Sequence, residues 1–473
     1  MLFNSLDYLV FLTVALAGYW GLRHLRVARL VLVLVLSCLF YATSSPWYLG
    51  LIFFSTLVDW FVARSIAGSE EDAPRRRWLA VSVVVNLALL GFFKYGLAED
   101  LIRALARGGV LDLDPDLVAI GLPVGISFYT FESLSYCIDV YRRHCPAART
   151  PFELLFFITF FPKLVAGPIA RPAELFPQIQ GEPRLSRDQV SEGLFLILTG
   201  LVKKVIFADF VSINLVDRVF ERPDGYTSAE VAVALYGFTL QMYADFSGYT
   251  DIARGSGKLF GIELPENFER PYQARSPAEF WRRWHMTLST WLRDYLYFPL
   301  GGSRHGEART YLNLWLTIFL IGLWHASRTT LLNFLLYGAL QASAVALHRY
   351  VSRRWPSAGP DPGWLVAAKV LGTMQFVVFT RILFRARDLE NAGEVWDQLV
   401  LGTGGMANVA PWLWAALLVG FAAHYTPLGW YAALRARFSA LPAAGQGAVI
   451  ALVLGLLLFV ANGQTVPYIY FQF

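Results

Sequence analysis

Residues 245–304 read DFSGYTDIARGSGKLFGIELPENFERPYQARSPAEFWRRWHMTLSTWLRDYLYFPLGGSR, and this stretch decides how the rest of the chain is interpreted. It concentrates ionisable side chains between two strongly apolar regions of the sequence. These side chains are Arg282, Arg283, His285, Arg293, Asp294 and Arg304. Ionisable groups at membrane depth are costly and usually line a cavity or a pathway. We therefore expect the chemistry of the protein to lie here.

The composition of the chain is that of an integral membrane protein. Of its 473 residues, 56% are hydrophobic and only 16% are charged, which lies outside the balance of a soluble domain. Repeated apolar runs of about 20 residues predict transmembrane helices and exclude the alternating strands of an outer-membrane barrel. The net charge of +5 requires no nucleic-acid partner, since Lys and Arg in short loops of membrane proteins set orientation.

Hydropathy predicts an all-α, polytopic membrane protein with about eleven transmembrane helices. Twelve apolar segments are the candidates for these crossings, and they cover residues 7–22, 30–43, 48–66, 78–97, 117–140, 190–220, 229–250, 311–325, 330–350, 364–384, 411–430 and 446–462. The loops at 23–29, 67–77 and 141–149 carry several arginines, so the positive-inside rule places them in the cytoplasm and the N-terminus outside. The more polar segment 98–116 is expected on the outer surface as a short helix and turn.

The segment 151–180 is apolar but interrupted by prolines and glycine. These residues are Pro162, Gly167, Pro168, Pro172 and Pro177. Broken helix at membrane depth is tolerated only where protein or a water-filled cavity surrounds it. Two interpretations are open, a re-entrant segment that lines the site and a helix-turn-helix at the surface. The absence of internal repeats and long linkers predicts a single domain over 1–473, with a polar core at 241–345.

Two regions of different local structure are predicted within the polar stretch. Residues 265–280 are expected to be irregular because they contain several prolines, whereas 277–298 is expected to form one helix that starts at Pro277 after Ser276. An aromatic face is predicted from residues that recur at spacings of three and four. These residues are Trp281, Trp284, Leu288, Trp291 and Tyr295. The side chains off this face are Arg282, Arg283, His285 and Arg293.

Two histidines are candidates for catalysis. His325 ends an apolar span in FLIGLWHAS and is either a core residue bonded to a carbonyl or a general base, for which the usual imidazole pKa of about 6.5 is suitable. His285 lies among arginines and tryptophans and is a candidate to order the site, contact an anionic donor or act as a second acid–base group. The alternative for this region is an interfacial aromatic belt with snorkelling arginines.

Asp245 and Asp251 lie at the end of a predicted span, where they either pair with the arginines of the next helix or form a solvated helix end. The seven histidines and three cysteines show no metal-ligand spacing, so no metal and no bound cofactor are predicted. The odd number of cysteines implies no disulfide framework.

The sequence resembles the membrane-bound O-acyltransferase family, in the branch of the alginate O-acetyltransferase membrane subunit. The segments that carry the resemblance are VAGPIARPAELFPQI (165–179), DFSGYTDIARGSGKLFGIELPENFERPY (245–272), FWRRWHMTLSTWLRDYLYFPLGG (280–302), GLWH (322–325) and PYIYFQF (467–473). One departure is Gln341, which stands where the family usually carries a second histidine.

The resemblance implies a multi-pass inner-membrane enzyme with spanning helices and re-entrant segments around a central polar tunnel. It implies that an acyl group passes from a cytoplasmic donor, with acetyl-CoA expected, to an exopolysaccharide acceptor, directly or through a periplasmic acetyltransferase. It places His325 on the catalytic histidine of the family and His285 on the histidine of its RRWH segment. The residues expected in donor binding or site architecture are Arg282, Arg283, Trp281, Arg293 and Asp245.

Two other functions fit parts of the pattern. D-alanyl transfer to teichoic acid shares the span pattern, but PENFERPY and STWLRDYLYFPLGG favour the acetyl branch. A non-enzymatic glycan or acyl transporter would also place a polar core among apolar helices. Transporters often show inverted repeats with broken helices in both halves, whereas the breaks in this chain cluster in the middle. Besides membrane lipid, the expected partners are the acyl donor, the periplasmic acetyltransferase and the polysaccharide.

Overall fold

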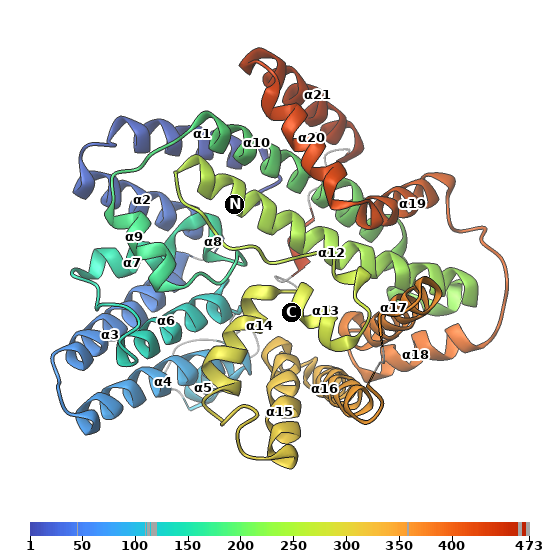
Figure 1. The fold of residues 1–473 in the computed structure, drawn as a ribbon, viewed down its shortest axis with the longest axis horizontal. Helices are drawn as coiled ribbons and strands as arrows, with labels where there is room; N and C mark the ends of the chain where they lie inside the picture. The colour runs from blue at the N-terminus through green and yellow to red at the C-terminus, as the bar shows by residue number, and fades with distance from the viewer. Residues whose placement is uncertain are drawn as a thin grey trace. The chain divides into compact units, whose positions relative to one another are not determined.

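The computed structural model describes residues 1–44, 46–108, 110, 114, 121–356, 359–461 and 466–469. Their regular secondary structure is helical (Figure 1). One isolated β-bridge joins Phe268 and Trp284. The all-α prediction is therefore confirmed for this part of the chain. The residues form two compact units, one of Met1–Gln189 with Ser256–Pro265 and the other of Val190–Gly255 with Glu266–Phe473. A single functional domain with its core at 241–345 stays a prediction.

The first unit contains the N-terminal helices. They are α1 (Leu6–Gly21), α2 (Arg26–Ala42), α3 (Leu49–Ala67), α4 (Asp72–Lys94), α5 (Leu97–Arg107), α6 (Ile126–Tyr141), α7 (Pro151–Thr159), α8 (Phe161–Leu164) and α9 (Pro172–Gln180). Thr150 caps the N-terminus of α7, because its hydroxyl accepts a hydrogen bond from the backbone N–H of Glu153 at 3.3 Å. Pro151 occupies the first helical position.

The segment 151–180 is broken into α7, α8 and α9, as its prolines predict. Residues 153–170 are all buried. Within them the Lys163 ammonium pairs with the buried carboxylate of Glu132. This burial contradicts a surface position for 153–170, whereas α9 exposes Ala173, Glu174 and Pro177 on one face, so the two interpretations stay open for the segment as a whole. A re-entrant position within a membrane stays a prediction.

The second unit contains most of α10 and α12 together with the later helices. Their bounds are α10 (Arg187–Val202), α11 (Asp217–Glu221), α12 (Ser228–Leu259), α13 (Pro277–Arg283), α14 (Met286–Leu292), α15 (Glu307–His325), α16 (Leu331–Arg354), α17 (Gly363–Arg385), α18 (Leu389–Val400), α19 (Pro411–Tyr425), α20 (Leu428–Ala440) and α21 (Ala443–Ala461). Between α10 and α11 the chain forms two π-helical segments, η3 (Lys203–Asp209) and η4 (Ser212–Val216).

Five helical segments of the described residues are long and apolar enough to cross a membrane. They are Pro46–Gly68, Asp72–Lys94, Leu331–Arg354, Gly363–Arg385 and Ala443–Ala461. A membrane protein is thus supported, whereas the number of about eleven crossings stays a prediction. Part of the segment expected outside the membrane forms α5, and most of 109–120 falls outside the described residues.

Candidate active site

His325 is the last residue of α15, where the predicted span also ends. It is buried, with 5% of its surface exposed. Its imidazole stacks on Phe334 of α16, with ring centroids 5.8 Å apart, and meets Phe384 of α17 at 5.2 Å. The indole of Trp324 contacts the same imidazole at 4.6 Å. Three helices therefore hold His325 among aromatic rings, an environment that suits both interpretations of this histidine.

Two glycines bring α15 and α16 together next to His325. A Cβ atom at Gly322 would lie 2.4 Å from the carbonyl oxygen of Phe334, and one at Gly338 would lie 2.7 Å from that of Phe319. Real Cβ atoms do not approach this closely, so glycine is required at both positions. Because Gly322 lies less than one helical turn before His325, this close packing places the imidazole against α16.

His285 lies at a break between two short helices, which contradicts the prediction of one helix over 277–298. Helix α13 ends at Arg283, α14 starts at Met286, and residues 293–297 are π-helical. His285 itself has the left-handed φ of 45°. The cause lies in the preceding irregular segment. The Met286 backbone N–H donates to the Asn267 carbonyl at 2.9 Å, and residues 268 and 284 form the isolated β-bridge.

The Asn267 side chain fixes the His285 ring. Its Oδ1 atom lies 3.1 Å from His285 Nδ1 and accepts the backbone N–H and hydroxyl of Thr287 at 3.2 and 3.0 Å. An oxygen that accepts these bonds requires a proton on Nδ1, so Nε2 carries the lone pair. His285 lies outside the five candidate spans, and burial lowers the pKa of its ring to about 3. The imidazole is therefore neutral at physiological pH.

Trp324 connects the two predicted histidines. Its indole lies 6.0 Å from the His285 ring and 4.6 Å from the His325 ring, measured between centroids. Phe246 of α12 meets His285 edge-on from another side at 4.7 Å. The structure thus brings both histidines predicted from sequence to one aromatic cluster of the second unit.

Gln341 of α16 bridges two neighbouring helices. Its Oε1 atom accepts the indole N–H of Trp281 at 3.3 Å, and its amide donates to the Thr380 hydroxyl of α17 at 3.0 Å. The side chain is fully buried, so both polar ends of the amide are used. The departure from the family pattern at Gln341 therefore coincides with a complete polar link between α13, α16 and α17. Trp281, predicted for site architecture, takes part in this link.

The predicted donor-binding arginines do not gather around the histidines as free cations. Arg283 forms an ion pair with Glu279 at 2.8 Å and donates to the Glu269 carbonyl. Arg293 is exposed and pairs with Asp294 at 2.8 Å. Arg282 is exposed and forms no ion pair with another described residue within 4 Å. A role of these three residues in donor binding stays a prediction.

Asp245 and Asp251 pair with lysines, so neither arginine pairing nor a solvated helix end is found, while a role of Asp245 in donor binding or site architecture stays a prediction. Asp245 is buried and lies 2.8 Å from the ammonium of Lys204, while Asp251 lies 2.6 Å from that of Lys203. The reason is that α12 presents these positions to η3 and not to the next helix. Asp245 also accepts the backbone N–H of Ile469 at 2.7 Å. It therefore attaches part of the C-terminal motif PYIYFQF to α12.

Arg381 is a buried residue of the same cluster that the sequence interpretation missed. Only 1% of its surface is exposed, and its guanidinium lies 4.6 Å from the Trp284 ring and 5.3 Å from the Phe384 ring. The signal in the sequence is an arginine inside the apolar span 364–384, the kind of residue that marks function in membrane helices. Because Arg381 lies inside a predicted transmembrane span, it was not considered as a site residue.

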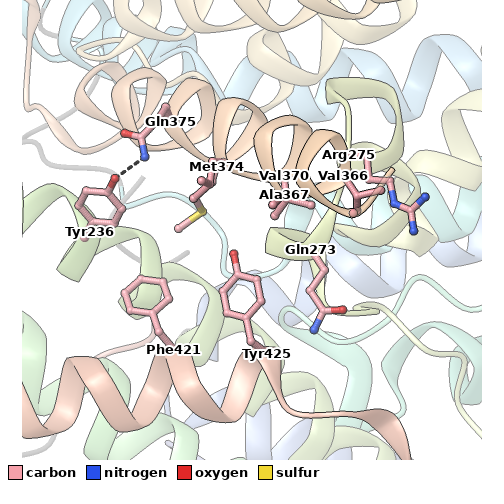
Figure 2. Close-up of a pocket in the computed structure, with 12 residues that line it drawn as sticks. Tyr236, Gln273, Arg275, Val366, Ala367, Val370, Met374, Gln375, Phe421 and Tyr425 are labelled. Atoms are coloured by element: carbon pink, nitrogen blue, oxygen red, sulfur yellow. Dashed lines mark hydrogen bonds between the residues drawn. The ribbon is translucent and has the colours of Figure 1, made fainter. Parts of the chain in front are cut away.

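A separate cleft of about 710 Å³ lies between α12, α17 and α19 (Figure 2). At one end Gln375 donates a hydrogen bond to the Tyr236 hydroxyl, and at the other end lie Gln273 and Arg275. The lining of this cleft is mainly apolar and does not include His325. The described residues contain no group of three or more histidine, cysteine or carboxylate side chains that could hold a metal.

Comparison with known proteins identifies relatives over most of the chain. A sequence model of MBOAT, the membrane-bound O-acyltransferase family, matches residues 149–358. The chain is 37% identical to the probable alginate O-acetylase AlgI of Pseudomonas syringae pv. tomato over 395 residues, which cover 82% of this chain and 74% of that protein. It is 33% identical to the peptidoglycan O-acetyltransferase of Helicobacter pylori, over 86% of this chain and 81% of the relative.

A more distant similarity extends to a protein with a different acyl group. The teichoic acid D-alanyltransferase of Bacillus subtilis is 25% identical over 56% of this chain and 69% of the relative. The names of these three relatives thus describe acyl transfer involving alginate, peptidoglycan and teichoic acid, respectively.

Proposed function

Since this chain belongs to the membrane-bound O-acyltransferase family, we propose that it transfers acetyl groups from acetyl-CoA for the O-acetylation of an exported polysaccharide such as alginate. The observation that carries the proposal is the similarity, over most of the chain, to relatives named as alginate O-acetylases. Membership in an acyltransferase family speaks against a non-enzymatic transporter.

In the proposed reaction His325 is the general base. Its imidazole takes the proton of the acceptor hydroxyl while the hydroxyl oxygen bonds to the thioester carbonyl carbon. The C–S bond then breaks, and the proton passes to the leaving thiolate, so that an O-acetyl ester and CoA are formed. General-base assistance contributes about 10² to 10⁴ in rate. The rings of Trp324, Phe334 and Phe384 support this role because they exclude water that would hydrolyse the thioester.

His285 is proposed as the second histidine of the site. The hydrogen bond from Nδ1 to Asn267 fixes the ring in the tautomer whose Nε2 carries no proton. Its contact with Trp324 supports a role in holding the aromatic wall beside His325. A change at Asn267 would act on the reaction through His285 without removing either imidazole.

The proposed location is the bacterial inner membrane, with about eleven crossings and the N-terminus outside. The arginine-rich loops at 23–29, 67–77 and 141–149 support this orientation. Donor and acceptor would reach His325 from opposite faces through a central polar tunnel. The acetyl group would reach the glycan directly or through a periplasmic acetyltransferase, and the exposed Arg282 is a candidate contact for the polyanionic donor.

The proposal is tested by His325→Ala in detergent-purified protein. We expect release of CoA from acetyl-CoA in the presence of acceptor to fall at least about 100-fold, because general-base assistance is lost. The control is His348→Ala, which removes a partly exposed histidine from α16. Transfer by His325→Ala at the rate of the control variant would contradict the assignment.

Peptidoglycan is a second candidate acceptor. It is favoured by the Helicobacter relative, which aligns over a larger share of this chain than the alginate O-acetylase relatives cited above. Mass spectrometry of polysaccharide and peptidoglycan from cells with and without His325→Ala separates the two, because only the true acceptor loses acetyl groups. A loss of D-alanine from teichoic acid instead would indicate the more distant branch.

A further inference from the structure

Arg381 presents a charge that the described residues do not neutralise. Arg381 lies near the C-terminal end of α17 in the second unit, and only 1% of its surface is exposed. Within the described ranges, no carboxylate oxygen lies within 4 Å of its guanidinium, although the neighbouring Arg385 has one in Asp217 at 2.6 Å. The Nε and Nη2 atoms of Arg381 have no hydrogen-bond acceptor among these residues. A buried ion without a neutralising counter-ion is strongly destabilising, so its retention requires a reason.

Contacts with aromatic rings do not supply that reason. The guanidinium lies 4.6 and 5.3 Å from the centroids of the Trp284 and Phe384 rings, and it also makes a side-chain hydrogen bond with Tyr272. Cation–π attraction offsets only part of the loss of hydration when an arginine is buried. Neither the rings nor the Tyr272 hydroxyl provides an acceptor for Nε and Nη2. The N–H pair of Nε and Nη2 therefore points to a ligand that accepts hydrogen bonds.

The position of Arg381 connects it to both histidines. Phe384 contacts the Arg381 guanidinium on one side and the His325 imidazole at 5.2 Å on another. Trp284, whose ring also contacts the guanidinium, immediately precedes His285 in the chain. A ligand held by Arg381 would thus lie beside the proposed general base and not in the cleft of Figure 2, whose lining does not include Arg381.

We propose that Arg381 binds an oxyanion of the acyl donor through its Nε and Nη2 protons. This inference rests on the proposed acetyl transfer. The shared chemistry is an anionic oxygen that accepts two hydrogen bonds, for which the planar guanidinium is suited. The donor offers two such oxygens. One is the thioester carbonyl oxygen, which becomes negative as the acceptor oxygen attacks, and the other belongs to a phosphate of CoA. In the first case Arg381 stabilises charge that develops during the reaction.

The test compares Arg381→Met and Arg381→Lys with Arg385→Gln. Arg385→Gln is the matched control, because it also removes a cation from α17, one turn later, but from an ion pair with Asp217. Each variant is purified in detergent and assayed with acetyl-CoA and with S-acetyl-pantetheine, a donor without phosphates. Melting temperature is recorded for every preparation.

We expect Arg381→Met to lose about 10² to 10³ in kcat, the effect of removing one donor to a developing oxyanion, and to melt no lower than wild type. A fall in kcat with both donors identifies the thioester carbonyl oxygen as the group that Arg381 binds. Loss with acetyl-CoA alone, seen mainly in KM, identifies a phosphate. We expect Arg381→Lys to recover little activity, since an ammonium cannot reproduce the paired N–H groups.

Two results would overturn the inference. If Arg381→Met transfers acetyl within about twofold of Arg385→Gln, Arg381 binds no oxyanion that matters for the reaction. If Arg381→Met melts lower than Arg385→Gln and Arg381→Lys restores both stability and activity, the residue is structural. Failure of the proposed function is distinguishable, because wild-type protein would then transfer no acetyl group with either donor.

Discussion

Replacing Gly322 by alanine tests how helix packing positions His325. The new Cβ atom would lie 2.4 Å from the Phe334 carbonyl oxygen and 2.7 Å from the Cα atom of Gly338. Because carbon contacts are most favourable at about 3.5 to 4.0 Å, α15 and α16 must separate locally by roughly 1 Å. These neighbours are backbone atoms, which cannot rotate away as a flexible side chain would.

The expected cost has two opposing parts. Overpacking of this kind destabilises by about 1 to 3 kcal/mol, and the better helix propensity of alanine offsets about 1 kcal/mol. The net change in the free energy of unfolding should therefore be a loss of up to about 2 kcal/mol. Activity should fall further than stability. His325 follows on the same helix, and a displacement of about 1 Å at a reacting group can cost about 100-fold in rate.

The assay measures thermal unfolding in detergent and the initial rate of CoA release. Gly372→Ala is the matched control, since Gly372 lies inside α17 and a Cβ atom there would meet nothing within 4 Å. We expect this control to melt at or above the wild-type temperature and to keep its activity. If Gly322→Ala matched the control in both measurements, the close approach of α15 and α16 would not position His325.

Two further predictions concern the polar groups around the site. Gln341→Leu should lower the free energy of unfolding by about 1 to 3 kcal/mol, because the Trp281 indole N–H loses its acceptor, and a melting temperature equal to wild type would contradict this. If Arg283 contacts the phosphates of the donor, Arg283→Gln should raise the acetyl-CoA concentration needed for half-maximal activity several-fold. The melting temperature should change little, because the ion pair of Arg283 with Glu279 is partly exposed. Arg435→Gln, which loses a similar pair with Glu192, serves as the control, and equal donor dependence of the two variants would remove Arg283 from donor binding.

Elements that depend on long apolar runs were predictable from sequence. Helix α17 covers Gly363–Arg385 against the predicted 364–384, and α15 ends at His325 as expected. Such helices are encoded locally, since about 20 consecutive apolar residues suffice to indicate them. The break of 151–180 was equally predictable, because proline removes a backbone donor wherever the chain lies.

The same local reasoning failed for 277–298. The spacing of the residues on its predicted aromatic face is helical, and four of these five residues, including Leu288, are indeed buried. The break at His285 depends on hydrogen bonds to Asn267, which lies 18 residues earlier and has no visible relation to that spacing. Likewise, Asp245 finds Lys204 across 41 positions of the chain because α12 packs against η3.

The sequence by itself determined that this protein is a helical membrane acyltransferase with His325 and His285 as its candidate catalytic residues, because hydropathy and motifs are properties of neighbouring residues. Only the tertiary structure decided which groups surround them. It placed both histidines against Trp324, linked Gln341 to two helices and brought Arg381 beside Phe384. The physical reason is that packing and the burial of charge depend on contacts between helices far apart in the chain. The sequence shows that Arg381 is a charge within an apolar span, but only the tertiary structure shows which side chains surround it.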